Sequence, residues 1–400
     1  MQALEGLRVV DMAMVFAGPG AAKYLADYGA DVIKVEPPEG DGTRNLGWRD
    51  PRDGETLMWK LLGRGKRAVV LDLKSEAGVD AMHRLLAGAD VLVENLRPGG
   101  LERLGLAPLD LLARNPGLVV LRVTGFGQTG PYANRPGFAT LAEAMGGFAA
   151  INGEPDGAPL LPPIALTDEL AAIVGAFAVL AAVRHRDRTG EGQVIDVNLL
   201  ESMLQVMGPL PSVAAQLGEI QPRLGSGIPY VVPRGTYQCA DGVWVAVSTS
   251  TESVARRVLE LLGIADDDRF TSFEGRVAHR TELDRLCTEW IRARPSPVVL
   301  AEFEAAQAAI APVYTMADVL ADPHVRERST MVEVDGVTMP GPVARLERTP
   351  GRVRHAGRPL GADTDAVLDA LDGPDGPWHP RSAPGAPGPG QGGATRGGTA

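Results

Sequence analysis

Short apolar runs alternate with stretches of helical spacing over the first two hundred residues of the chain. Apolar runs at 7–10 and 32–35 flank a glycine–proline turn and a helical stretch at 21–28, and this order is typical of a βαβ unit. The pattern continues with strands expected at 69–71, 91–93, 118–123 and 193–197, and with helices expected at 76–87 and 108–114. Strands that alternate with helices predict an α/β fold with a parallel, doubly wound sheet.

The pattern changes in the second half of the chain. Residues 138–202 have mostly helical spacing, whereas two apolar-rich runs at 235–238 and 243–247 flank Asp241-Gly242, which is a strong hairpin signal. We therefore predict a large discontinuous domain made of residues 1–200 and 311–372. A linker and a small α+β domain occupy 201–310, and the glycine- and proline-rich segment 373–400 is predicted to be a disordered tail.

No apolar stretch reaches the roughly 20 residues that span a bilayer. The longest candidate, 170–183, follows Asp168 and precedes Arg184, so we interpret it as a buried helix. The N-terminus lacks the charged and apolar regions of a signal peptide. The two cysteines, Cys239 and Cys287, have no metal-ligand spacing and fit a reducing compartment. We expect a cytoplasmic protein without membrane association.

The charge balance excludes further function classes. The chain has 39 Lys and Arg against 50 Asp and Glu, a net charge of −11. Nucleic-acid binders usually carry a basic footprint, so no nucleic-acid partner is expected. The six histidines are scattered and none pairs with another at ligand spacing, so no metal site is expected either.

The glycine turn of the first βαβ unit is a candidate nucleotide site. Gly18 and Gly20 follow a strand and open a helix, and Glu36 ends the next strand, where a ribose-binding acid would lie. The third glycine of that motif would fall at Lys23, whose side chain prevents the close packing the position needs. A dehydrogenase is therefore disfavoured, although the helix start remains suited to an anion.

Two further features carry candidate chemistry. Basic residues at 63–67, 74, 97 and 103 lie in loops around strand ends, where open α/β sheets bind ligands. A ligand with several phosphates would need such a cluster, and a solvated charged face is the alternative interpretation. Asp168 stands at the start of an apolar helix; it is either a helix cap or a partly desolvated nucleophile.

Taken together, these stretches resemble the class III CoA-transferase family, also called the CaiB/BaiF family. The matching stretches are 7–11, 17–19, 29–36, 66–67, 71–74, 89–95, 97–99, 125–132, 188–197, 311–313, 349–350 and 359–361. Their order and spacing carry the resemblance, which runs from about residue 4 to residue 371. It implies a Rossmann-like large domain, a small domain and an interlocked homodimer.

The resemblance implies an enzyme that moves CoA from an acyl-CoA donor to a free carboxylic acid by covalent catalysis. The catalytic aspartate of the family falls on Asp168, which would form an aspartyl anhydride and then an aspartyl-CoA thioester. Backbone N–H groups near Gly146 and Gly147 are expected to stabilise the oxyanion. Phe138 and Met145 are expected to line the acyl pocket.

The resemblance also implies where coenzyme A (CoA), which carries the acyl group of the substrate, would bind. The expected contacts are Val15, Phe16, Ala17, Lys66, Arg67, Leu71, Leu73, Lys74, Asn95, Leu96, Arg97, Arg103 and Arg135. Many members have an arginine after the residue that corresponds to Glu36, where this chain has Pro37-Pro38. Arg44 or Arg135 is the expected substitute for that contact.

A 2-methylacyl-CoA racemase of the same family is the main alternative. Racemases use a histidine and an aspartate as bases, and the histidine falls at Phe138, which cannot exchange a proton. Glu143 is a weaker substitute base, so a transferase is expected. A dehydrogenase and an inactive CoA-binding protein are the remaining alternatives; Lys23 argues against the first and Asp168 against the second.

Overall fold

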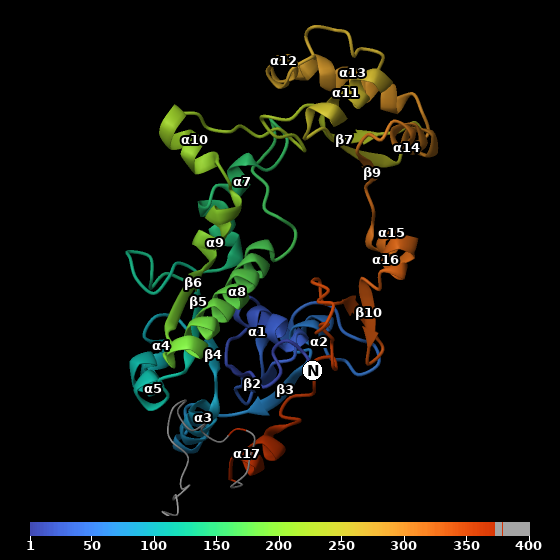
Figure 1. Cartoon of the computed structure of the whole chain (residues 1–400). Coiled ribbons are helices and arrows are strands. Elements are labelled where there is room, and N and C mark those ends of the chain that lie inside the picture. Colours follow the sequence, from blue (N-terminus) through green and yellow to red (C-terminus); the bar gives the residue numbers. More distant parts are fainter. Residues whose placement is uncertain (373–377, 379–400) are drawn as a thin grey trace, which may run out of the picture. The chain divides into compact units, whose positions relative to one another are not determined.

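The computed structural model describes residues 1–372 and Trp378, so most of the predicted tail at 373–400 lies outside the described residues. The chain forms two compact units (Figure 1). The large unit contains Met1–Gly137, Asp168–Leu199 and the chain from Val332 onward. The small unit contains Phe138–Thr167 and Leu200–Met331.

The large unit is built on a six-stranded parallel sheet with the order β3-β2-β1-β4-β5-β6. The strands are β1 (Arg8–Asp11), β2 (Asp31–Glu36), β3 (Lys66–Val70), β4 (Val91–Glu94), β5 (Val119–Thr124) and β6 (Val194–Asn198). This arrangement confirms the predicted doubly wound α/β sheet. The order reverses between β1 and β4, and open sheets of this kind bind ligands beyond the carboxyl ends of the strands at that point.

Helices cover both faces of this sheet. They are α1 (Ala17–Asp27), α2 (Leu57–Leu62), α3 (Glu76–Gly88), α4 (Gly100–Arg103), α5 (Pro108–Arg114), α8 (Leu166–Thr189) and α17 (Thr364–Asp372), with a 3-10 turn, η1 (Gly42–Asn45). Helices α3, α5 and α17 share one apolar core with the strands. Helix α1 packs on the opposite face of the sheet. Successive side chains of a strand point to opposite faces, so the same strands contribute side chains to the packing on both sides. A hairpin of β10 (Met331–Val334) and β11 (Val337–Pro340) adds a two-stranded sheet.

The small unit contains an antiparallel sheet and mostly short helices. Its strands are β7 (Arg234–Gln238), β8 (Trp244–Ser248) and β9 (Ile310–Pro312). Its helices are α6 (Ala139–Met145), α7 (Phe148–Ile151), α9 (Leu199–Val206), α10 (Leu210–Leu217), α11 (Glu252–Leu261), α12 (Phe273–Ala278), α13 (Arg280–Arg292), α14 (Ser296–Ala305), α15 (Met316–Ala321) and α16 (Pro323–Glu327). The hairpin at Asp241-Gly242 is confirmed by the register of β7 and β8, in which Gln238 pairs with Trp244.

Three boundaries differ from those read off the sequence. Residues 138–167 belong to the small unit, where Gly146 and Gly147 lie against Met203 and Met207. The small unit runs to Met331 instead of 310, since β9 joins its sheet by pairing with β8 and the segment with α15 and α16 belongs to the same unit. Strand β3 begins at Lys66 and not at residue 69, because a buried ion pair allows this lysine to lie inside the sheet.

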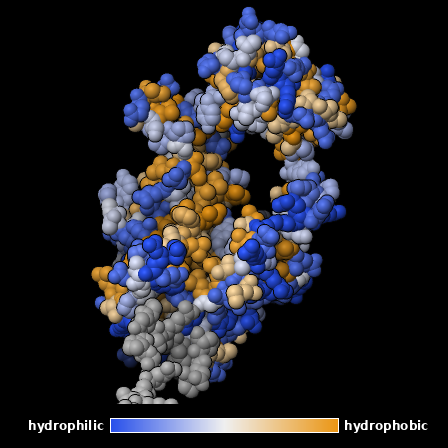
Figure 2. Space-filling model, in the orientation of Figure 1, coloured by the Kyte–Doolittle hydropathy of each residue, from blue (hydrophilic) through white to orange (hydrophobic). Residues whose placement is uncertain are grey.

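Helix α8 has two different apolar faces. Small residues cover its buried face, at Ala171, Ala172 and Ala176, whereas Ile173 and Phe177 are half or more exposed, Phe177 at 72%. Figure 2 shows apolar surface along this helix. Within the described residues, α8 is the one helix whose length and composition would suit a membrane span, and 39% of its most apolar window is buried. The predicted buried helix is therefore buried on one side only.

Candidate active site

The loop between β1 and α1 lies at the point where the strand order reverses. The Met12 N–H donates to the Val93 carbonyl at 2.9 Å, and Asn95, just beyond β4, binds Met14 through both of its amide groups. Its Nδ2 donates to the Met14 carbonyl at 2.6 Å, and its Oδ1 accepts from the Met14 N–H at 2.8 Å. Two of the expected CoA contacts lie here. Val15 is exposed at the tip of this loop, whereas the side-chain amide of Asn95 is hydrogen-bonded to the loop backbone.

A cluster of buried charges lies beneath this loop. The Lys34 ammonium lies 3.0 Å from Asp41 and 3.9 Å from Asp11, and all three side chains are buried. Burial alone would lower the pKa of Lys34, but Asp11, Asp41 and Glu36 raise it above its usual value. Burial would raise the pKa of Asp41, but Lys34 and hydrogen bonds from Thr43 lower it below its usual value. The pair is therefore ionised at neutral pH.

Sequence reasoning did not select Lys34 or Asp41. The available signal was a lysine in the middle of an otherwise apolar strand, which implies a buried counter-charge. The spacing of Asp41 and Thr43 was a second signal, because an aspartate accepts from the backbone two residues on at the start of a helical turn.

Lys66 and Arg67 begin β3, and both are engaged by carboxylates of neighbouring strands. Lys66 is buried, and its ammonium donates to Asp11 at 2.8 Å and to the Pro19 carbonyl at 2.7 Å. Arg67 pairs with Asp31 at 2.7 Å. These ion pairs, and the burial of Lys66, disfavour the expected phosphate contacts of both residues.

Arg44 is also committed within the protein. Its guanidinium forms a two-pronged pair with Glu36, at 2.7 and 2.8 Å, and stacks on the Trp59 ring at 3.6 Å. Both members of the pair are buried. Arg44 is therefore no substitute for the missing arginine contact, and Glu36 is not available to a ribose. Arg135 is exposed and stacks on the Tyr132 ring at 3.8 Å.

A cleft of about 580 Å³ brings together several other predicted CoA contacts. It is lined by Leu73 and Lys74 after β3, by residues of α3, and by Arg103 and Leu104. Lys74 and Arg103 are exposed and lie about 30 positions apart in the sequence, so the fold brings two cations from two loops into one cleft, whose α3 side also carries Glu76 and Asp80. The remaining predicted contacts have mixed environments: Ala17 and Leu71 are buried, Phe16 and Leu96 are half-buried, and Arg97 is exposed.

Asp168 lies in the first turn of α8 and is half-buried. Its neighbours in the chain are held by hydrogen bonds. The Thr167 N–H and hydroxyl donate to Glu143, at 3.3 and 3.1 Å, and Glu169 accepts from the Tyr24 hydroxyl and lies 3.7 Å from Lys23. The start of a helix stabilises an anionic side chain, because its N–H groups and dipole point toward it. The position suits a fixed, ionised carboxylate.

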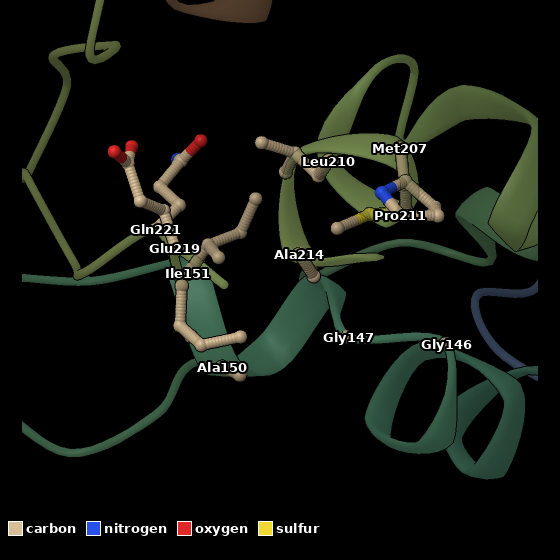
Figure 3. A pocket seen from close by; sticks show the side chains of 11 residues that line it. Gly146, Gly147, Ala150, Ile151, Met207, Leu210, Pro211, Ala214, Glu219 and Gln221 are labelled. Atoms are coloured by element: carbon tan, nitrogen blue, oxygen red, sulfur yellow. The ribbon is translucent and has the colours of Figure 1, made fainter. Parts of the chain in front are cut away.

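The small unit contains an apolar pocket of about 200 Å³ (Figure 3). Gly146, Gly147, Ile151, Met207 and Leu210 are among its lining residues, with Glu219 and Gln221 at one side. Of the four residues expected around the acyl group, the pocket contains the two expected oxyanion donors, Gly146 and Gly147. Its lining does not include Phe138, which is 68% exposed, or Met145, which is also exposed.

The two glycines differ as oxyanion donors. The Gly146 N–H already donates to the Ala142 carbonyl at 2.7 Å, at the end of α6. Gly147 has a φ of +87°, which residues with a side chain rarely adopt, and it starts α7. The Gly146 N–H is thus engaged within α6, and an oxyanion role for Gly147 stays an expectation. Within the described part of the chain, no group of three or more His, Cys, Asp or Glu side chains is arranged to hold a metal ion.

Comparisons with known proteins agree over nearly the whole chain. The family model described as CoA-transferase family III matches residues 4–364. The succinyl-CoA–L-malate CoA-transferase beta subunit of Chloroflexus aurantiacus is 38% identical over 383 residues, which cover 92% of this chain and 94% of that protein. The succinate–glutarate CoA-transferase of Agrobacterium fabrum is 37% identical over 386 residues, which cover 92% of this chain and 96% of that protein.

A solved structure is similar in the same way. The crystal structure of a CaiB/BaiF family protein from Brucella suis matches with a TM-score of 0.83 and 34% identity. The match covers 93% of this chain and 100% of that chain.

Replacing Arg44 should test its structural role. Arg44→Met leaves the Glu36 carboxylate buried without its partner, so the free energy of unfolding should fall by about 3–5 kcal/mol. Urea denaturation measures this, with Arg49→Met, an exposed arginine of the same segment, as the control that changes it by less than about 0.5 kcal/mol. Unchanged stability together with weaker CoA binding would instead assign Arg44 to the ligand.

Proposed function

The chain belongs to the class III CoA-transferase family, and from this premise we propose that Asp168 is the nucleophile that carries CoA between two carboxylic acids. The chain is an enzyme of this class and acts on CoA thioesters. The observation that carries the proposal is the position of Asp168, half-buried in the first turn of α8 between two neighbours held by hydrogen bonds. A nucleophile must be ionised and oriented, and this position favours both.

The proposed reaction has four steps and returns the enzyme unchanged. The Asp168 carboxylate attacks the thioester carbonyl, the C–S bond breaks, and an aspartyl anhydride and CoA thiolate form. The thiolate attacks the aspartyl carbonyl, which releases the donor acid as a carboxylate and leaves an aspartyl-CoA thioester. The acceptor carboxylate attacks that thioester and displaces the thiolate. The thiolate then takes the acyl group of the second anhydride, which restores Asp168.

We propose short dicarboxylic acids as the donor and acceptor. The relatives are named for succinyl-CoA or succinate together with L-malate or glutarate, and all of these are dicarboxylates. A second carboxylate needs a cationic partner, and an arginine fork suits one best. The small unit supplies a candidate in Arg234, which lines a groove of about 550 Å³ together with the hydroxyls of Ser226, Thr236 and Ser248.

We propose that the cleft with Lys74 and Arg103 holds phosphate groups of CoA, and that Val15–Ala17 contact the same ligand. Two exposed cations in an acidic protein, at the carboxyl edge of the sheet, suit a polyphosphate ligand.

Racemisation is the weaker alternative, because Phe138 has no titratable group. The substitute base Glu143 is buried and accepts two hydrogen bonds from Thr167.

The central test removes the nucleophile. Asp168→Ala should lower CoA transfer from succinyl-CoA by about a thousandfold or more while acyl-CoA binding persists. Mass spectrometry after mixing wild-type protein with succinyl-CoA should find an adduct on the Asp168 peptide that hydroxylamine removes.

The matched control is Asp187→Asn, an exposed carboxylate at the other end of α8, which should keep the adduct. Full transfer by Asp168→Ala would refute the proposal. Exchange of the α-proton in deuterated water without any adduct would favour the racemase.

The cationic cleft can be tested separately from the chemistry. Lys74→Ala and Arg103→Ala should each raise KM for succinyl-CoA about five- to tenfold, because each removes a charge-assisted contact to phosphate. The value of kcat should stay within about twofold. Arg256→Ala, which removes an exposed arginine of α11, is the control and should leave KM unchanged. Unchanged KM in both cleft variants would place the phosphates elsewhere.

We further propose that the chain works as a homodimer in the cytoplasm and that the exposed face of α8 lies in the dimer interface. Ile173, Val174, Phe177 and Leu180 are large, apolar and at least 38% exposed, and they recur at helical spacing. A contiguous apolar stripe of this kind marks an interaction surface. The absence of nucleic-acid and membrane partners remains an expectation from charge and composition.

A charge on this stripe should weaken the dimer. Buried aromatic anchors commonly contribute about 2 kcal/mol or more, so Phe177→Glu should raise the dimer dissociation constant at least about thirtyfold. Sedimentation velocity over a concentration series measures this change. Leu109→Glu, at an equally exposed leucine of α5, should stay dimeric. A monomeric wild-type protein would refute the proposal, and a wild-type protein that partitions onto lipid vesicles would favour a membrane surface.

A further inference from the structure

The loop between β1 and α1 is held almost entirely by side chains from other elements. Asp11 accepts from the Ala13 N–H at 3.1 Å, and the Lys34 ammonium donates to the Ala13 carbonyl. Asn95 holds both backbone groups of Met14. Asp11 is the last residue of β1, Lys34 lies inside β2, and Asn95 directly follows β4. The loop is thus fixed from three strands at once.

Val15 is the residue of this loop that most needs such support. Its φ is +70°, in the left-handed region that β-branched residues almost never occupy. Its side chain is 40% exposed, so packing does not compensate for the strain. The Val15 N–H points at the Asp41 carboxylate, 3.3 Å from each oxygen. Without that acceptor, the backbone would relax to an ordinary conformation.

Asp41 is in turn fixed by Lys34 and Thr43. Lys34 lies 3.0 Å away, and Thr43 donates to Asp41 from its N–H at 2.9 Å and from its hydroxyl at 2.8 Å. Lys34 therefore touches the loop twice, directly at the Ala13 carbonyl and indirectly through Asp41. Another buried pair, Arg64 with Asp27 at 2.6 Å, lies at the far end of α1 from the loop, and its arginine donates to the Pro340 carbonyl.

We propose that Lys34 and Asp41 are positioning residues for the acyl-CoA substrate. Through Ala13 and Val15 they hold the loop in a strained conformation before the ligand arrives, so that binding does not have to order it. This proposal rests on the proposed function, in which Val15–Ala17 contact CoA. A preorganised loop raises affinity because the conformational cost is met in folding and not in binding.

The first experiment measures affinity without turnover. In an Asp168→Ala background, titration calorimetry with succinyl-CoA should show about tenfold weaker binding for Asp41→Asn and for Lys34→Met, since misplaced contacts lose affinity. In the active enzyme, KM for succinyl-CoA should rise to a similar extent while kcat changes by less than about threefold. Thr43→Val, which removes one hydrogen bond to Asp41, is a milder variant in case the charge variants do not fold, and it should show about threefold weaker binding.

The matched control is Arg64→Met. It breaks an equally buried ion pair in the same unit, so it should lower the unfolding temperature as the other variants do, yet leave the succinyl-CoA affinity unchanged. If Asp41→Asn and Thr43→Val bind as tightly as the parent, the positioning role is wrong while the proposed function stands. If the Asp168→Ala parent itself shows no affinity for succinyl-CoA or for other acyl-CoAs, the proposed function fails instead.

A double-mutant cycle separates positioning from general stability. Glycine adopts the left-handed conformation without strain, so in a Val15→Gly background the loop needs the Asp41 acceptor less. The cost of Asp41→Asn in succinyl-CoA affinity should therefore fall from about tenfold to about twofold. An equal cost in both backgrounds would overturn the link between Asp41 and the strain at Val15.

Discussion

Burial of charge beneath the first loop is the constraint on which the rest of the large unit depends. Two lysines, Lys34 and Lys66, are buried inside the sheet, and each is stable there only because a carboxylate lies beside it. Asp11 serves both lysines and also accepts from the loop backbone. Removing one member would leave an uncompensated charge in the interior, so the strand ends, the loop and the start of α1 are coupled through electrostatics as well as through apolar packing.

Most of the fold was predictable because local patterns carry it. Apolar runs predict strands such as β1, β2 and β5, and the turn residues Asp241-Gly242 predict the hairpin. The start of β3 was missed because Lys66 looks like a loop residue until its distant partner, Asp11, is known. The bounds of the small unit differ from the predicted ones partly for a similar reason: β9 is only three residues long and is recognisable as a strand only through its pairing with β8.

The candidate site residues also differ in whether local patterns or distant contacts decide their role. Asp168 was selected from its place in a family pattern, and Lys74 and Arg103 from their place near strand ends; neither choice needed knowledge of contacts. Arg44 and Lys66 were selected by the same reasoning, yet both are used up by buried carboxylates. A basic residue in an acidic chain is equally able to bind a ligand or to neutralise an internal charge. The sequence alone does not separate these uses, because the partner of Lys66 lies on a distant strand and that of Arg44 depends on how the turn after β2 folds back.

Helix α8 links the chemistry to the assembly. Its buried face consists of small residues, which allow close approach: a side-chain carbon added at Gly20 of α1 would lie 2.8 Å from Ala172, and one at Gly175 would lie 3.1 Å from Leu121. The same helix starts with Asp168 and exposes a stripe of large apolar side chains along its other face. A helix clamped this tightly on one side cannot rotate to hide that stripe. The packing that fixes the start of α8, where the proposed nucleophile lies, therefore also keeps the apolar stripe exposed for the proposed dimer.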